Sequence, residues 1–169
     1  TKKPFSNFLP GIAGLYGTPM WVFYVNRGQG ISSFGTKNKD NAILEFFPAN
    51  KAYQNVTSLG FRTFIKGIHR GKRFFYEPFK PSLAGSSAAP EQVMEISSHE
   101  FAICETHKLL GLEIRVRYFT VPGEPLAALA RELSIQNISS RPLEFEVLDG
   151  LPAVNPYGMN EFFAKKRIY

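Results

Sequence analysis

The chain has 169 residues, enough to bury one substantial core but seldom enough for two domains. Hydrophobic residues make up 44% of it and charged residues 20%, a composition that excludes an intrinsically disordered chain. The formal net charge is +6, and the longest apolar runs, such as residues 21–25, are too short to cross a membrane as a helix. We expect one globular domain over residues 1–169, with no membrane contact.

The first residues, Thr1-Lys2-Lys3-Pro4-Phe5, contain neither an initiator Met nor the apolar core of a signal peptide. We therefore expect the chain to be a piece of a longer protein. Cys104 is the only cysteine, so no internal disulfide can form, which fits a reducing compartment. These features favour a cytoplasmic location.

Short runs rich in Phe, Tyr, Val and Ile are separated by Gly, Pro, Asn and Ser, a pattern typical of antiparallel sheets. The strands that this pattern predicts are, in chain order, residues 21–25, 31–34, 42–47, 61–65, 74–79, 93–97, 101–105, 112–121, 128–137 and 143–148. The start of 128–137 could instead form a helical turn. Strands at this spacing predict an all-β fold, an antiparallel two-sheet β-sandwich with its core between the sheets.

Three segments give more local expectations. In residues 113–121 charged residues alternate with Ile114 and Val116, which predicts a strand with one buried and one wet face. The polar stretch 138–142 separates two alternating segments and predicts a hairpin turn. Residues 80–90 have the composition of a mobile loop within the domain.

No complete set of catalytic residues is evident. His69, His99, His107 and Cys104 are too scattered to predict a metal site, and no Gly-x-Ser-x-Gly nucleophile elbow is present. Gly28-Gln29-Gly30 lacks the third glycine of a nucleotide-binding fingerprint, so a hairpin turn explains it better. The acidic residues show no spacing that singles out a pair for sugar hydrolysis. We predict no catalytic residue and no metal in this chain.

The positive charge raises the question of nucleic-acid binding. The densest basic patch comprises Lys66, His69, Arg70, Lys72 and Arg73, where a turn between two strands is expected. Sequence motifs of nucleic-acid-binding domains are absent, so a solvated turn explains the patch better. We predict no nucleic-acid partner.

The region between Phe5 and Arg62 is dense in polar and aromatic residues, among them Trp21, Tyr53 and Gln54. Aromatic faces stack on the C–H faces of sugar rings, while amide, guanidinium and ammonium groups bind hydroxyls. This mixture suits a polyol ligand, although any single aromatic residue is better explained as part of the core.

Several segments together resemble the N-terminal domain of the cellobiose phosphorylase group, glycoside hydrolase family 94 and its relatives. The segments that carry the resemblance are residues 5–14, 21–35, 38–40, 45–54, 61–64, 96–101 and 118–120. They span nearly the whole chain and do not distinguish the β-glucoside linkage on which a parent enzyme would act.

The resemblance implies a β-sandwich of the galactose mutarotase-like supersandwich type, followed in the parent enzyme by a helical linker and an (α/α) barrel. Such an enzyme cleaves a β-linked glucose disaccharide or oligosaccharide with inorganic phosphate, with inversion, and releases glucose 1-phosphate. Phosphate is the nucleophile, so one carboxylic acid suffices, and that acid belongs to the barrel. The resemblance implies no cofactor beyond phosphate as co-substrate, and no catalytic residue in this chain.

The resemblance also implies a parent homodimer in which the sandwich helps form the interface and lends loop residues to the neighbouring substrate cleft. Arg27, Gln29, Asn38 and Lys39 are the candidates for that role. Together with Trp21, Tyr53 and Gln54 they form the set of candidate substrate-binding residues.

The competing hypothesis is an independent carbohydrate-binding module. Such a module would bind oligosaccharide alone through an exposed aromatic platform. A phosphorylase domain would instead leave apolar surface bare where the barrel or the partner packs. Residues 155–169 leave the alternating strand pattern and are expected to lead toward a linker.

Overall fold

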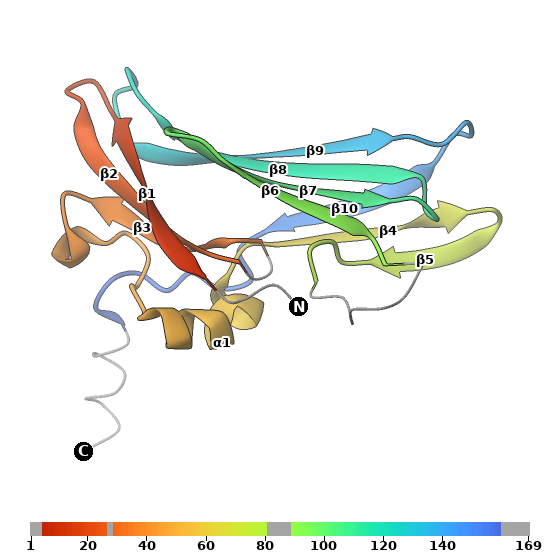
Figure 1. Cartoon of the computed structure of the whole chain (residues 1–169), viewed down its shortest axis with the longest axis horizontal. Coiled ribbons are helices and arrows are strands. Elements are labelled where there is room, and N and C mark those ends of the chain that lie inside the picture. The colour runs from red at the N-terminus through yellow and green to blue at the C-terminus, as the bar shows by residue number, and fades with distance from the viewer. Residues whose placement is uncertain (1–4, 27–28, 81–88, 160–169) are drawn as a thin grey trace, which may run out of the picture.

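The structure, a computed structural model, describes residues 5–26, 29–80 and 89–159 (Figure 1). Most of the loop expected over 80–90, and the end of the segment 155–169, lie outside the described residues. No helix in these three described stretches is long and apolar enough to cross a membrane.

The fold is all-β and sandwich-like, with three antiparallel sheets. The first sheet, in the order β1-β2-β3, contains β1 (Ser6–Ala13), β2 (Thr18–Val25) and β3 (Ile31–Thr36). The second, in the order β10-β4-β5, contains β4 (Arg62–His69), β5 (Lys72–Tyr76) and β10 (Glu144–Gly150). The third, in the order β6-β7-β8-β9, contains β6 (Glu91–Ile96), β7 (Glu100–His107), β8 (Leu112–Val121) and β9 (Ala128–Asn137). Two helices, η1 (Lys39–Asn41) and α1 (Ala49–Leu59), lie between β3 and β4.

The second and third sheets face one another and enclose the main core (Figure 1). β8 supplies Ile114, Val116 and Tyr118, each fully buried, and β4 supplies Ile65 from the opposite layer. Along the whole of β8, buried residues alternate with partly exposed ones, so the expectation of one buried and one wet face is confirmed for this strand. The alternation fixes the register, because a shift by one residue would expose the whole apolar row.

The first sheet closes one end of the sandwich. Val22 and Tyr24 on one face of β2 join the main core, while Phe23 and Val25 on the other face pack against Ala52 and the rest of α1. A parallel bridge between Gly14 and Pro122 connects the β1–β2 turn to the end of β8. The sandwich core therefore covers one face of this sheet, and the helix covers part of the other.

The strand expected over 42–47 is wrong. These residues form an irregular segment held by isolated bridges, Gly35 with Ala42 and Leu44 with Pro156, and α1 begins at Ala49. Apolar or aromatic residues at 49, 52, 53 and 56 follow the helical i, i+3, i+4, i+7 spacing. Asn50 and Asn55, both weak helix formers, lie between these positions and weaken the helical signal.

The hairpin expected around 138–142 is also wrong, although both flanking strands exist. β9 pairs with β8, whereas β10 pairs with β4, so the connection crosses from one layer to the other. Both segments alternate apolar and polar residues in sequence, and such strands satisfy their inner faces equally well in an arch as in a hairpin. The Asn137 side chain supports the crossing, since its Nδ2 donates to the Arg141 carbonyl at 2.7 Å.

We expect Gly30→Ala to destabilise the fold strongly. Gly30 has a φ of +89°, and a Cβ there would lie 2.5 Å from the buried Phe101 ring. Strain and overpacking together predict a loss of about 3 kcal/mol in the free energy of unfolding, measured by urea denaturation. Gly123→Ala is the control, because Gly123 has a similar φ of +78° but open space around it. Its loss is expected to be about 1 kcal/mol, and equal losses in both variants would contradict the packing argument.

Candidate functional site

An aromatic cluster lies on the face of the first sheet that α1 partly covers. It consists of Phe8 on β1, Trp21 and Phe23 on β2, and Phe46 in the segment before α1. Phe8 pairs across the strands with Phe23, and its ring centroid lies 4.9 Å from that of Phe23 and 6.0 Å from those of Trp21 and Phe46. Phe8 is 49% exposed, so this cluster presents an aromatic face to solvent.

Asn38 and Lys39 lie beside this cluster at the start of η1. The Trp21 indole Nε1 donates to the Asn38 carbonyl at 3.0 Å, which ties the loop to β2. Asn38 is the N-cap of η1, and its Oδ1 accepts from the Asp40 amide at 3.0 Å. Lys39 contacts Asp40 at 3.5 Å, but both side chains are largely exposed, so their attraction is weak. The Lys39 ammonium is thus available to an external polar group.

Tyr53 and Gln54 lie on α1. Tyr53 packs, like Trp21, against the small core around Phe23 and Val25, while Gln54 is exposed. The structure therefore brings Trp21, Asn38, Lys39 and Tyr53 to the same side of the first sheet. Arg27 lies outside the described residues.

Gln29 lies apart from these residues and is only 2% exposed. Its Nε2 donates to the Pro78 carbonyl at 3.4 Å, and its Oε1 accepts from Arg131 Nη2 at 3.0 Å. The side chain is bound inside the fold and presents no group to an external ligand.

Arg131 on β9 is the centre of a largely buried polar network that sequence reasoning missed. Its Nε donates to the Tyr118 hydroxyl and its Nη2 to Thr63 Oγ1, both at 3.0 Å. Its Nη1 forms an ion pair with Asp149, whose other oxygen accepts from Thr63 at 2.6 Å. With the bond to Gln29, the network joins β4, β8, β9, β10 and the loop before β3. Burial raises the pKa of the Tyr118 hydroxyl, against the opposing effect of the guanidinium.

A second buried charge, Glu105 on β7, is 1% exposed. It accepts from the Tyr76 hydroxyl, from the Phe79 amide at 2.7 Å and from Gln92 Nε2 at 2.7 Å. Burial, with the neighbouring carboxylate, raises the pKa of Tyr76. The carboxylate is fully engaged in holding the segment after β5 against β7, so it is not available as a general acid or base.

Both buried charges carry a sequence signal. Arg131 stands at the inward position of an alternating strand, in line with Leu129 and Leu133, and Glu105 follows Ile103 in the same way. A charge at an apolar position of an alternating pattern predicts a buried polar partner, because an unpaired buried charge is very costly.

The described residues show no set of metal ligands, since no three His, Cys, Asp or Glu side chains converge in them. Burial, followed by the charge of Glu113, raises the pKa of Cys104, which disfavours the nucleophilic thiolate. The aromatic cluster and its polar neighbours offer stacking and hydrogen bonds to a ligand. No protein-family model matches the sequence, and no curated protein sequence matches it.

We expect Arg131→Met to lower the free energy of unfolding by about 3 kcal/mol, measured by urea denaturation at pH 7. The substitution leaves Asp149 without its cation and Gln29 and Tyr118 without their donor, as when one partner of a buried pair is removed. Arg115→Met is the control, because it breaks the more exposed pair of Arg115 with Glu95 and is expected to cost less than about 1 kcal/mol. A loss for Arg131→Met no greater than that of the control would contradict the structural role of the network.

Proposed function

We propose that this chain is the non-catalytic N-terminal β-sandwich domain of an inverting glycoside phosphorylase of the cellobiose phosphorylase group, which it resembles in sequence. In this proposal the domain shapes the sugar-binding cleft of a dimeric parent enzyme. The parent transfers a glucosyl unit from a β-linked glucose disaccharide or oligosaccharide to inorganic phosphate. The chemistry belongs to the barrel of that enzyme, and this domain contributes contacts to sugar.

The observation that carries the proposal is the position of Trp21, Asn38 and Lys39 beside the exposed ring of Phe8. The ring offers a flat face to a pyranose, and the ammonium offers three donors to its hydroxyls. The hydrogen bond from Trp21 to the Asn38 carbonyl holds the backbone of this loop against β2, which lowers the entropy cost of binding.

Bare apolar surface supports a domain role over an independent module. The β1–β2 turn exposes Tyr16 to 95% and Leu15 to 59%, and Ile12 and Leu126 nearby are 58% and 63% exposed. Gly14 in this turn approaches Ala127, so the turn and the β8–β9 connection form one projecting tip. A solvated tip gains nothing from such residues, whereas a tip that packs on another domain or subunit does.

The independent carbohydrate-binding module is the second candidate function. The exposed Phe8 ring favours it, because a stacking platform can act without a catalytic partner. The two functions differ in whether the chain alone binds sugar tightly.

We expect the full-length polypeptide to release glucose 1-phosphate from at least one β-linked glucose disaccharide or oligosaccharide in the presence of phosphate. The chain of 169 residues alone is expected to release none, because the buried Glu105 and the ion-paired Asp149 are engaged in the fold. A coupled assay for glucose 1-phosphate over a panel of linkages measures both. If a folded full-length protein released no glucose 1-phosphate from any of these substrates, the proposal would be contradicted.

Trp21 is the only tryptophan, so the fluorescence of the chain reports on the candidate site. We expect β-glucan oligosaccharides at up to about 1 mM to leave the emission of the isolated chain nearly unchanged, because the barrel wall of the cleft is absent. Saturable quenching that is weakened about tenfold by Phe8→Ala, but not by the distant Phe75→Ala, would favour the independent module instead.

A further inference from the structure

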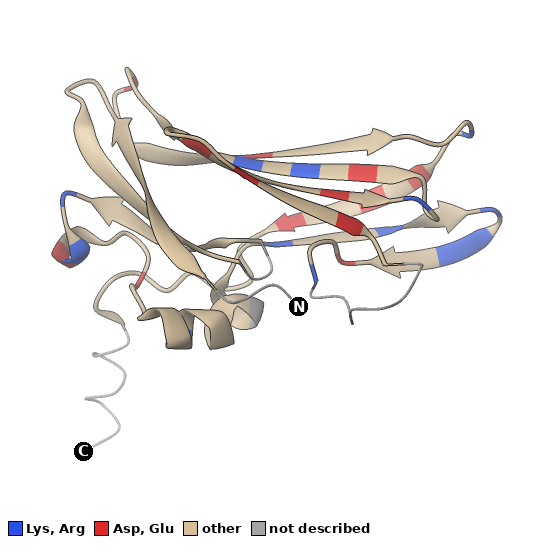
Figure 2. Ribbon diagram, viewed as in Figure 1, with Lys and Arg blue, Asp and Glu red and all other residues tan. Residues whose placement is uncertain are grey.

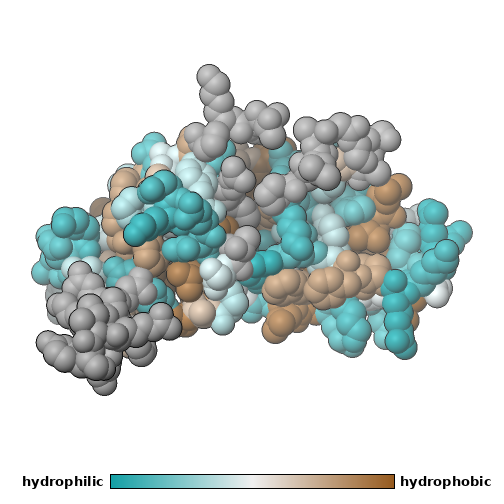
Figure 3. All heavy atoms as spheres, turned by 90° about the horizontal axis from the view of Figure 1, so that it is seen from below, coloured by the Kyte–Doolittle hydropathy of each residue, from teal (hydrophilic) through white to brown (hydrophobic). Residues whose placement is uncertain are grey.

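The outer face of the β10-β4-β5 sheet carries an apolar strip that the described residues leave largely exposed, apart from the Arg62 guanidinium 5.2 Å from the centre of the Phe64 ring. Phe64 on β4 pairs across the strands with Leu148 on β10, and its ring centroid lies 5.9 Å from that of Phe75 on β5. Phe75 is 68% and Leu148 71% exposed, and Ile68, further along β4, is 47% exposed. Figure 3 shows apolar side chains gathered on this half of the molecule, bordered by hydrophilic ones.

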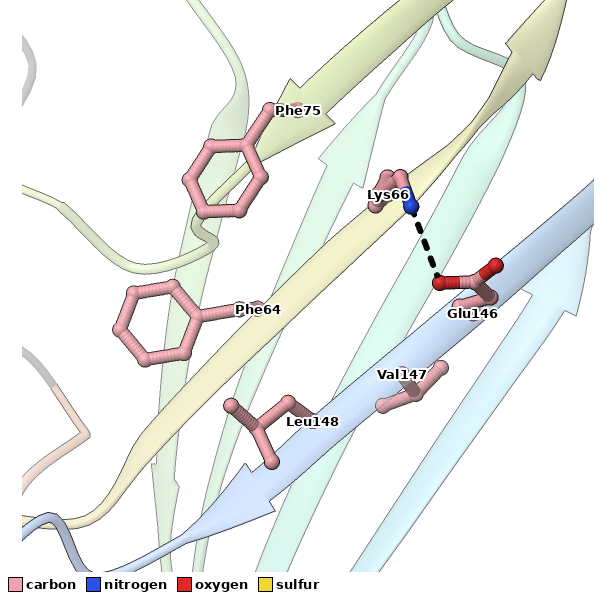
Figure 4. Close-up of a pocket in the computed structure, with 6 residues that line it drawn as sticks. All are labelled: Phe64, Lys66, Phe75, Glu146, Val147 and Leu148. Atoms are coloured by element: carbon pink, nitrogen blue, oxygen red, sulfur yellow. Dashed lines mark hydrogen bonds and ion pairs between the residues drawn. The ribbon is translucent and has the colours of Figure 1, made fainter.

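The strip surrounds a hollow of about 420 Å³, lined by Phe64, Lys66, Phe75, Glu146, Val147 and Leu148 (Figure 4). Its two charged groups are engaged with each other, since Lys66 Nζ lies 3.3 Å from Glu146 Oε2. The rest of the lining is apolar. Small-molecule sites combine an apolar lining with polar groups that orient the ligand, and here those groups already form a pair. The hollow is better suited to apolar side chains of a macromolecular partner.

The charge around the strip is mainly positive near the β4–β5 turn, although the exposed Glu144 pairs across the strands with Ile68 on the same face. At one end the β4–β5 turn exposes Arg70, Lys72 and Arg73, none of which makes an ion pair within the described residues (Figure 2). The turn is rigid in shape, because Arg70 and Gly71 both have positive φ, 51° and 74°, as in a tight hairpin turn. A partner seated on the strip would meet these cations, so its flank should be acidic.

The dimensions match an α-helix. Three neighbouring strands span about 10 Å, close to the diameter of a helix with its side chains. A strand of eight residues such as β4 is about 26 Å long, the length of a helix of about 17 residues. Helices commonly pack on sheet faces with an apolar stripe of this width.

The described residues offer no such helix. α1 contains Lys51 and no acidic residue, and it already packs on the first sheet. Residues 160–169 carry three basic residues and one acidic residue, so the β4–β5 turn would repel them. A second copy of the chain brings the same positive face, and its net charge of +6 opposes self-association there.

We propose that the outer face of the β10-β4-β5 sheet is a docking surface for an acidic amphipathic α-helix that is not part of these 169 residues. The apolar stripe of the helix packs on Phe64, Phe75 and Leu148. Its acidic flank lies toward Arg70, Lys72 and Arg73. This inference does not depend on the proposed sugar-binding role, because the two surfaces lie on different sheets.

The test uses the whole chain and a synthetic helical peptide of about 17 residues, with Leu at i, i+3, i+4 and i+7 positions and Glu on one flank. Binding is measured by fluorescence anisotropy of the labelled peptide. We expect it to bind at least about tenfold more tightly than a peptide with Lys in place of Glu, or one with the Leu residues spread around the helix. Equal affinity for all three peptides, or no binding of the Glu peptide, would overturn the proposal.

Substitutions in the protein test whether the peptide binds at the apolar strip. Phe75→Ser and Leu148→Ser are each expected to weaken binding about tenfold or more, and both residues are exposed enough for the fold to persist, as the unchanged thermal midpoint will show. Leu126→Ser is the matched control, since Leu126 is 63% exposed at the β8–β9 connection. If this control loses as much affinity as Phe75→Ser, the surface is wrongly placed.

The charge contribution has its own control. Replacing Arg70, Lys72 and Arg73 together by Gln is expected to weaken binding at least about fivefold and to remove most of its dependence on salt. Replacing the exposed Lys37, Lys39 and Lys51 by Gln removes the same charge elsewhere and should change affinity less than about twofold. Sedimentation of the chain alone tests whether a second copy occupies the face. A dimer mass for the chain, and a monomer mass for the Leu148→Glu variant, would show this and would overturn the proposal.

Discussion

The guanidinium of Arg131 is the contact on which the arrangement of the sheets depends. A charge with a side chain only 8% exposed must be neutralised and hydrogen-bonded, and here the partners come from both layers of the sandwich. Thr63 and Asp149 belong to the β10-β4-β5 sheet, while Arg131 and Tyr118 belong to the sheet opposite. The network therefore selects the pairing of β10 with β4, since only that pairing brings Asp149 beside Thr63.

The pairing of β10 with β4 separates the apolar strip on the β10-β4-β5 sheet from the aromatic cluster on the first sheet. The inner face of the β10-β4-β5 sheet is committed to the core, and its outer face keeps Phe75 and Leu148 exposed. The aromatic cluster around Phe8 and Trp21 belongs to the first sheet, which turns its other face to the core. A ligand on one surface leaves the other accessible, so the proposed sugar and the proposed helical partner would not compete.

The sequence predicted what depends on local pattern. The strands at 112–121 and 128–137 have the expected bounds, because alternation over ten residues is a strong signal, and the all-β sandwich follows from such runs. β1 was missed because Pro10 and Gly11 interrupt its apolar residues. The strand that pairs with β10 could not be predicted, since side-chain alternation does not encode which strand lies beside it. For the same reason Gln29 seemed accessible: its burial depends on Arg131, which is 102 residues away in the chain.

Side-chain alternation also connects the two surfaces physically. On β4, Thr63 points into the Arg131 network and the next residue, Phe64, points out to the apolar strip. On β10, Asp149 and Leu148 divide in the same way. The network reaches Gln29, which directly precedes Gly30 and β3, and β3 pairs with the strand that carries Trp21. A helix that fixes Phe64 and Leu148 from outside therefore holds the same backbone that supports the network, and through it the sheet on which the aromatic cluster is built.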